Sequence, residues 1–343
     1  MRLEEKDKDL LEPLVKLSAQ IGSDPMLIQA SGGNTSEKID STLWVKASGL
    51  KLMDAQKKWM FVPVRLPETQ EAIASGDGDD ISRYVQGETG LRPSIETTLH
   101  ALLPHRVVLH VHSVHTICHV LQTDGKSKVS KCLEGLRWTW ITYHRPGLPL
   151  TQAVFDAIPE EPDILILQNH GLVVGGKDVH AAQRLLETVE KRLFIAPRSV
   201  PEVKMNELSP FLEAGFRLPK DPVIHGLATD AACHTAIKGG VPYPDHVIFL
   251  PPIPLIVASY QEYKNARENF KNRFDMEAPA ILVPGVGVVV RDDITFSAEE
   301  MLRAQANVFL RVPPESRIRY LSDSDVASLL NWEAEKFRRS LNN

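Results

Sequence analysis

Hydrophobic residues follow two different spacings along the chain, which predicts a protein built from both helices and strands. Apolar positions recur at helical spacing over residues 5–21 and again over 179–194. Short continuous apolar runs, one containing His110 and one at 164–168, have the length and composition of buried strands. Three further elements are expected: a helix after the His110 strand, a strand ending in a turn at 136–147, and a short helix at 151–162.

The segment before the predicted His110 strand is expected to contain a hairpin, then an exposed polar loop, and then the beginning of a helix. A short strand at 26–30 leads into SGGNTS at 31–36, and STLWVKAS at 41–48 returns as the second arm of the hairpin. Residues 66–80 are polar and are expected to be an exposed excursion. Pro93 suits the first turn of the next helix, whose buried stripe is formed by Ile95, Leu99 and Leu102.

Prolines are concentrated between the two halves of the chain. Residues 195–222 carry Pro197, Pro201, Pro210, Pro219 and Pro222, a density that interrupts regular structure. We therefore divide the chain into residues 1–195, a Pro-rich connector at 196–222, and a C-terminal α/β extension at 223–343.

The extension contains a segment that is weakly similar to a segment of residues 1–195. ILVPGVGVVVRDDITFSAEEML, which begins at Ile281, repeats the order of ILILQNHGLVVGGKDVHAAQRLL, which begins at Ile164: strand, glycine, valine run, polar turn and amphipathic helix. Val286 stands where His170 stands in the first copy. Either the extension is a degenerate repeat that packs on the first part, or the likeness is one that any two strand–turn–helix units share.

Composition restricts the class of protein. An apolar content of 43% and a charged content of 24% over 343 residues are ordinary for a globular protein with a sizeable core. The net charge of −5 gives no electrostatic basis for binding nucleic acid or an anionic membrane. The three cysteines form no CxxC pair, the N-terminus has no apolar signal core, and the apolar stretches are too short to span a bilayer. We expect a cytoplasmic protein with neither a nucleic-acid nor a membrane partner.

Three histidines are the strongest candidates for chemistry. His110 and His112 belong to one predicted buried strand, so the alternation of side chains places both imidazoles on one face. His170 ends a second apolar run and is followed at once by Gly171. One such histidine alone is more typical of an ordinary residue near a strand end. Together, three imidazoles from two strands predict a metal site with a coordination position left open for substrate.

Two further features lie before this site in the sequence. Glu96 falls in the first turn of a predicted helix, as either a carboxylate stabilised by the helix dipole or a metal ligand or proton-transferring base. The sequences at 31–36 and 46–49 (KASG) supply backbone N–H groups, hydroxyls, an amide and an ammonium. These groups suit a phosphate or carboxylate oxyanion, although they are also typical of a simple hairpin turn. His115 and His119 are either outer groups of the metal site or packing residues.

Read in order, GGNTS, KASG, PSIETTLH, HVH and QNHG resemble the motifs of the class II aldolase/adducin family. The likeness is nearest to the larger aldolases of the rhamnulose-1-phosphate type. It is strong from about residue 20 to 195 and looser beyond, where LPPIPLIV and VPGVGVVV are similar to the same group. The resemblance implies a three-layer α-β-α sandwich with a C-terminal α/β extension, in which residues 1–195 form the catalytic domain.

The resemblance also implies ligands for particular residues. It implies a zinc ion, or another divalent metal, held by His110, His112 and His170, with Glu96 as the general acid/base. The positions that match those around the donor phosphate are Gly33, Asn34, Ser48, Gly49 and Ser94. Family members often carry two adjacent serines before the acidic residue, whereas here Ile95 replaces the second and removes one hydroxyl donor.

The activity that this set implies is aldol cleavage of a sugar phosphate or sugar-acid phosphate. Breaking the carbon–carbon bond leaves an enediolate, and a bound metal cation stabilises its charge by several kcal/mol. A decarboxylase or C4-epimerase would use the same metal–enediolate chemistry, and a non-catalytic interaction module of the adducin kind would lack the metal. Because family members place active sites at subunit boundaries in cyclic tetramers, we expect a homo-oligomer, with a tetramer implied.

Overall fold

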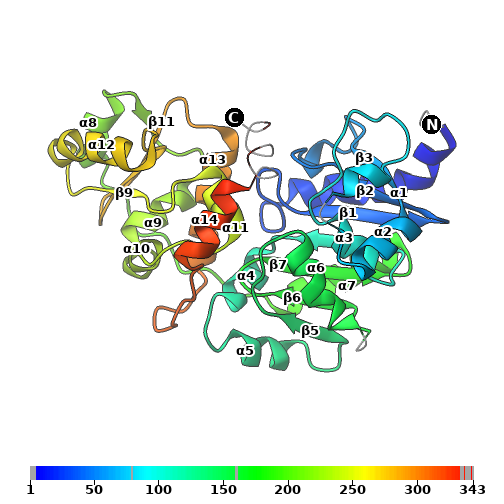
Figure 1. Cartoon of the computed structure of the whole chain (residues 1–343). Coiled ribbons are helices and arrows are strands. Elements are labelled where there is room, and N and C mark those ends of the chain that lie inside the picture. Colours follow the sequence, from blue (N-terminus) through cyan, green and yellow to red (C-terminus); the bar gives the residue numbers. More distant parts are fainter. Residues whose placement is uncertain (1–4, 79, 159–160, 333–335, 337–340, 342–343) are drawn as a thin grey trace.

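The computed structural model describes residues 5–78, 80–158, 161–332, 336 and 341. Within these residues the chain forms one seven-stranded sheet and one four-stranded sheet. Figure 1 shows the elements of the large sheet on the right, in blue to green, and those that follow them in the sequence on the left. No helix in the described part of the chain is long and apolar enough to cross a membrane.

The large sheet is almost entirely antiparallel. Its strands are β1 (Asn34–Ile39), β2 (Thr42–Lys46), β3 (Phe61–Arg65), β4 (Val107–Val111), β5 (Trp138–Ile141), β6 (Ile164–Leu167) and β7 (Gly171–Gly176). They lie in the order β3-β2-β1-β4-β7-β6-β5, and only the β5–β6 pair is parallel. The two strands that were expected to carry the histidines, β4 and the strand before His170, therefore lie close together, separated by β7.

Helices cover both faces of the large sheet because its strands alternate apolar side chains between the two faces. The helices are α1 (Glu5–Ser23), α2 (Leu66–Ala74), α3 (Thr97–Leu102), α4 (Val114–Val120), α5 (Gly125–Cys132), α6 (Leu148–Phe155) and α7 (Val179–Arg192). Leu109 and Val174 belong to one apolar cluster with residues of α1, α5 and α7. Val108 and Val173 belong to another with residues of α3 and α6, and α2 covers the same face further along. The predicted three-layer α-β-α sandwich is confirmed.

The residues after α7 form a smaller α/β unit. Its strands are β8 (Phe216–Arg217), β9 (Leu255–Ile256), β10 (Ala280–Val283) and β11 (Gly287–Arg291), in the order β8-β11-β10-β9. Its helices are α8 (Met205–Leu212), α9 (Gly226–Thr229), α10 (Ala231–Lys238), α11 (Pro244–Phe249), α12 (Tyr260–Phe274), α13 (Phe296–Phe309) and α14 (Asp323–Asn331). Because α8 and β8 fall within residues 196–222, this proline-rich segment contains regular structure and supplies an edge strand.

The smaller sheet repeats part of the larger one. β9 and β10 are parallel, β10 and β11 are antiparallel, and the long helix α13 follows, which is the order of β5, β6, β7 and α7. This topology agrees with the sequence similarity between the segments that begin at Ile164 and Ile281. The division into three segments stays a prediction.

The helix that follows the histidine strand joins the two units into one core. Ile117 and Cys118 of α4 lie in a single apolar cluster with Ile248 of α11 and Phe309 of α13. The thiol of Cys118 donates a hydrogen bond of 3.3 Å to the backbone carbonyl of Val308. The smaller unit therefore packs directly behind the end of β4.

The predicted hairpin was wrong in its register. Residues 26–30 form no strand, because the Asp24 carboxylate accepts a hydrogen bond of 2.8 Å from the backbone N–H of Met26 and holds a turn. The hairpin is instead β1 with β2, and the sequence SGGNTS leads into β1 where it was expected to be the turn.

Two other local predictions also need correction. Residues 66–80 are more than an exposed excursion, since α2 buries Ala72 and Ile73. Pro93 does not open a helix, because it pairs with Ala47 as an isolated β-bridge and α3 starts only at Thr97. Glu96 is consequently the N-cap residue of α3 and not a member of its first turn.

Candidate active site

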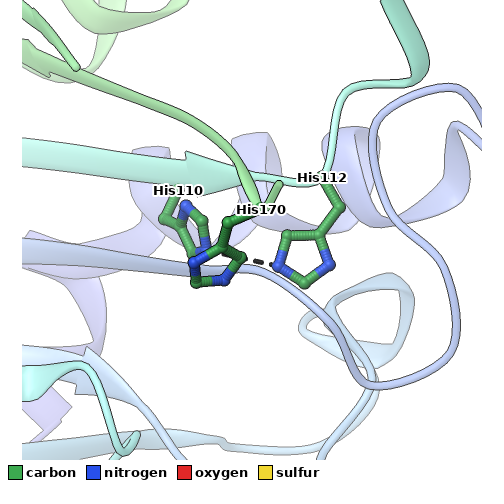
Figure 2. Close-up of side chains that lie close together, drawn as sticks. All are labelled: His110, His112 and His170. Atoms are coloured by element: carbon green, nitrogen blue, oxygen red, sulfur yellow. Dashed lines mark hydrogen bonds between the residues drawn. The ribbon is translucent and has the colours of Figure 1, made fainter. Parts of the chain in front are cut away.

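The three histidines meet at one end of β4 (Figure 2). His110 lies in β4, His112 follows its last residue, and His170 ends the turn between β6 and β7. One potential ligand atom from each ring lies within 4.8 Å of those of the other two, and all three residues are buried. The structure therefore brings together the three histidines that the sequence predicts to share a site, two from β4 and its end and one from the turn before β7.

Hydrogen bonds orient two of the rings. The Nδ1–H of His110 donates to the backbone carbonyl of Leu172 at 3.1 Å, and Nδ1 of His112 lies 2.6 Å from Oδ2 of Asp245. Both contacts favour the tautomer that carries its proton on Nδ1, in which Nε2 keeps its lone pair. The two Nε2 atoms face each other at 3.2 Å. Lone pairs that converge in this way are the donor set that a divalent cation takes.

Glu96 lies beside these nitrogens and is only 4% exposed. Its Oε2 accepts a hydrogen bond of 2.8 Å from the side-chain amide of Asn34 and lies 3.3 Å from Nε2 of His110. Its Oε1 lies 3.5 Å from Nε2 of His170 and has no hydrogen-bond partner among the described residues. One carboxylate oxygen is thus fixed, and the other is buried and available to a ligand.

The charge states of the site suit a cation. Burial lowers the pKa of His170 to about 3 and lowers that of His110 as well. Burial by itself raises the pKa of Glu96, but the interactions with His110 and His170 and the amide of Asn34 outweigh it and bring the pKa to about 2. Neutral imidazoles beside an ionised carboxylate are the protonation states that metal binding requires. The residues present therefore fit a divalent metal ion.

Asn34 is itself held by a residue that the sequence analysis did not single out. His100 of α3 is fully buried, and burial lowers its pKa to about 3, so its ring is neutral. Its Nδ1 pairs with the hydroxyl of Ser36 at 2.7 Å, and its Nε2 pairs with Oδ1 of Asn34. The amide nitrogen of Asn34 is consequently directed at Glu96.

All five positions predicted to surround a phosphate line one pocket with Glu96, His112 and His170. The other residues that line it are Ser31, Lys46, Ile95, Pro146, Pro244 and Asp245. Gly33 has a φ of +61°, and a Cβ there would lie 2.8 Å from the carbonyl oxygen of His110. Only glycine allows the loop that contains Gly33 to approach β4 so closely.

Two backbone N–H groups beside this pocket are already paired with backbone carbonyls. The N–H of Ser48 donates to the carbonyl of Arg92 at 2.9 Å, and the N–H of Ser94 donates to that of Lys46 at 3.1 Å. The ammonium of Lys46 is buried and contacts the carbonyl of Ser31 at 3.1 Å. The polar groups that the side chains bring to this pocket include the hydroxyls of Ser48 and Ser94 and this ammonium.

Two histidines that were candidates for the site contact other parts of the fold, and one residue that was not a candidate contacts the site. His119 contacts the carbonyl of Leu193, and His115 accepts from the N–H of Ile195, so both pack against the segment that follows α7. Asp245, which lies in α11, contacts a predicted ligand although no pattern in the sequence connects it with the histidines.

Comparisons with known proteins agree with these motifs. Residues 12–196, more than half of the chain, match the model of the family described as the class II aldolase and adducin N-terminal domain. An alignment over 184 positions, which covers 49% of this chain, is 30% identical to a protein of Bacillus subtilis (strain 168) named uncharacterized oxidoreductase YuxG. That match spans only 26% of the length of the Bacillus protein.

Solved structures of similar chains come from several organisms. The chain is 25% identical to the N-terminal class II aldolase domain of a conserved protein from Thermoplasma acidophilum, with a TM-score of 0.48, covering 56% of this chain and 94% of that one. It is 18% identical to an L-fuculose-1-phosphate aldolase from Thermus thermophilus, with a TM-score of 0.36 and coverages of 53% and 92%. On the extent of the family match, the chain belongs to the class II aldolase and adducin family.

Proposed function

We propose that this chain is a metal-dependent lyase that cleaves a carbon–carbon bond of a sugar phosphate or sugar-acid phosphate through an enediolate. The observation that carries the proposal is the convergence of three imidazoles on a buried carboxylate whose Oε1 has no hydrogen-bond partner in the described part of the chain. The pocket that Glu96, His112 and His170 line also holds the five positions that resemble a phosphate site.

The proposed metal ligands are His110, His112 and His170, and the proposed metal is zinc. When bound, the cation supplies positive charge that stabilises the negative charge developing on substrate oxygens. Burial lowers the pKa of His110 and of His170, so these two imidazoles are neutral and leave that charge undiminished.

Glu96 is the proposed general acid/base. Asn34 holds its Oε2, so the basic lone pairs of Oε1 keep a fixed position in the pocket. Oε1 can accept the proton that leaves the substrate hydroxyl as the carbon–carbon bond breaks, and can return a proton to the enediolate carbon. A buried carboxylate with one fixed and one free oxygen is suited to both steps.

The proposed phosphate site consists of Gly33, Asn34, Ser48, Gly49 and Ser94. Lys46 adds a buried positive charge to the same pocket, which favours a dianionic ligand. Ile95 lines the pocket where a hydroxyl would add a donor. We therefore propose that the phosphate is held by fewer hydroxyl contacts than the family motif provides.

Metal analysis and a substrate screen test this proposal. The purified chain is loaded with zinc, its bound metal is measured by mass spectrometry, and it is assayed against ketose 1-phosphates and phosphorylated sugar acids. We expect about one zinc per chain, release of an aldehyde with a three-carbon ketone, and loss of both metal and turnover in His110→Ala. Absence of bound metal would instead favour a non-catalytic module. Release of carbon dioxide, or epimerisation without cleavage, would replace the lyase assignment.

A further inference from the structure

Asp245 is a buried carboxylate that comes from outside the family-matched residues. It is the second residue of α11, is 3% exposed, and lines the candidate active-site pocket beside Pro244. Since the family match ends at residue 196, the family motifs assign it no role. The smaller α/β unit thus places an acidic side chain directly at the proposed metal site.

The contact that Asp245 makes is specific to one ring nitrogen. Its Oδ2 lies 2.6 Å from Nδ1 of His112, and both side chains are 4% exposed. Such a carboxylate accepts the Nδ1–H, selects the tautomer and fixes the plane of the ring, which leaves Nε2 as the ligand atom. The Nδ1–H of His110 is accepted in the same way by the backbone carbonyl of Leu172.

The smaller unit also holds the segment that carries the third histidine. Asn169, directly before His170, has a φ of +53°, a left-handed conformation that asparagine tolerates better than most residues. Its amide nitrogen donates to the backbone carbonyls of Pro242 and Arg319, each at 2.8 Å. Two of the three histidines are therefore positioned by contacts from residues beyond 222.

We propose that Asp245 is a positioning residue that holds His112 in its Nδ1–H tautomer with Nε2 directed at the metal, so that the C-terminal unit completes the metal site. The inference rests on the proposed metal site. Carboxylates that orient metal-bound histidines in this way also make the imidazole a stronger donor, and their removal typically weakens metal binding by about 10- to 100-fold.

Metal binding by full-length variants tests the proposal. Asp245→Ala removes the acceptor, Asp245→Asn keeps a weaker neutral acceptor in the same volume, and Asp230→Asn is a matched control in the same unit. Asp230 accepts from Arg198 at 2.9 Å and does not line the active-site pocket. Co²⁺ is the probe, titrated by its visible absorption against a competing chelator. We expect the affinity to fall by roughly 10- to 100-fold for Asp245→Ala and by less for Asp245→Asn. The control keeps the wild-type affinity even where its melting temperature drops.

A measurement on the metal-free protein distinguishes a role of Asp245 in orienting His112 from a general role in stability. ¹⁵N spectra of the histidine side chains report the tautomer of His112, which we expect to be fixed with the proton on Nδ1 in the wild type and in the Asp230→Asn control. In Asp245→Ala the signal should move to a mixture of tautomers while the far-UV circular dichroism stays unchanged.

The outcomes distinguish this inference from the function on which it rests. Unchanged Co²⁺ affinity in both Asp245 variants, or an unchanged tautomer of His112 in Asp245→Ala, would overturn it. If Asp245→Ala does not fold, the isosteric Asp245→Asn supplies both measurements. If wild-type protein binds no Co²⁺, the proposed function fails, and the tautomer alone still decides whether Asp245 orients His112.

Discussion

Exchanging Glu96 for glutamine removes a base while leaving the shape of the site unchanged. The amide oxygen of glutamine can accept the 2.8 Å hydrogen bond that Asn34 now donates to Oε2. The amide nitrogen then takes the place of Oε1, which lies 3.5 Å from Nε2 of His170. Because burial lowers the pKa of His170 to about 3, that ring is neutral and can accept from the new amide in the metal-free protein. The variant therefore satisfies the same neighbours without a lone pair basic enough to take a proton.

The size of the effect follows from these contacts. Exchanging one charge-assisted hydrogen bond for a neutral one costs about 1 kcal/mol of folding stability. Loss of general acid/base catalysis reduces the rate about 10²- to 10⁴-fold, which corresponds to about 3–5 kcal/mol of activation free energy. A small stability effect with a large kinetic effect is the expected signature of Glu96→Gln.

The assay compares single-turnover cleavage, bound zinc and melting temperature in Glu96→Gln and in a control. Glu37→Gln is the matched control, because Glu37 is buried to 3% exposure in β1 and pairs with Arg106 at 2.8 Å, outside the active-site pocket. We expect the control to lose stability and keep its turnover. Cleavage by zinc-loaded Glu96→Gln within tenfold of the wild-type rate would refute the assignment of Glu96 as acid/base.

Three further predictions concern metal, pH and the network behind Glu96. Zinc at a free concentration of 100 times Kd should raise the free energy of unfolding of the wild type by about 2.7 kcal/mol, seen as a higher melting temperature. His110→Ala should abolish this rise, and an equal rise in the variant would contradict the ligand set. Burial raises the pKa of Glu190 to about 7 from an ordinary value of 4.5, so the folded protein holds its proton more tightly than the unfolded chain does. Stability should fall by roughly 3 kcal/mol as the pH rises from about 4.5 to 7, and urea unfolding of Glu190→Gln should lack that decline. Asn34→Ala leaves a buried acceptor on Glu96 and a buried donor on His100 without partners, at a cost of about 2–5 kcal/mol in urea unfolding; a cost below that of an ordinary surface substitution would contradict the network.

The histidine site could be predicted from the sequence because local rules place its ligands. Alternation along β4 directs Val108 and His110 to one face, and Leu109 and Val111 to the other, where they join the apolar cluster under α1 and α7. The antiparallel pairing of β4 with β7 then brings the turn that contains His170 to the same end of the sheet. The strands thus explain why the three rings lie at the same end of the sheet, whereas contacts from residues beyond 222 hold His112 and the turn before His170 in place.

β1 could not be predicted because its buried positions are polar. Thr35, Ser36 and Glu37 are each at most 3% exposed, so this strand shows no apolar alternation. Their polar groups are satisfied by distant partners: Ser18 for Thr35, and His100 for Ser36. A strand stabilised by such tertiary hydrogen bonds lacks the periodicity that identifies strands in a sequence, and the more apolar residues at 26–30 were chosen in its place.

Asp245 shows the same limit at the site itself. The ligands of a metal follow from strand geometry, but the groups that orient them follow from whichever part of the fold packs against the rings. Here that part is set by a shared core, since Ile117 of α4, which follows β4, and Ile248 of α11 belong to the same apolar cluster. The sequence around Asp245 records only that α11 is a short buried helix. The family motifs thus identify the candidate ligands, whereas the contact that orients His112 comes from a part of the chain that those motifs do not cover.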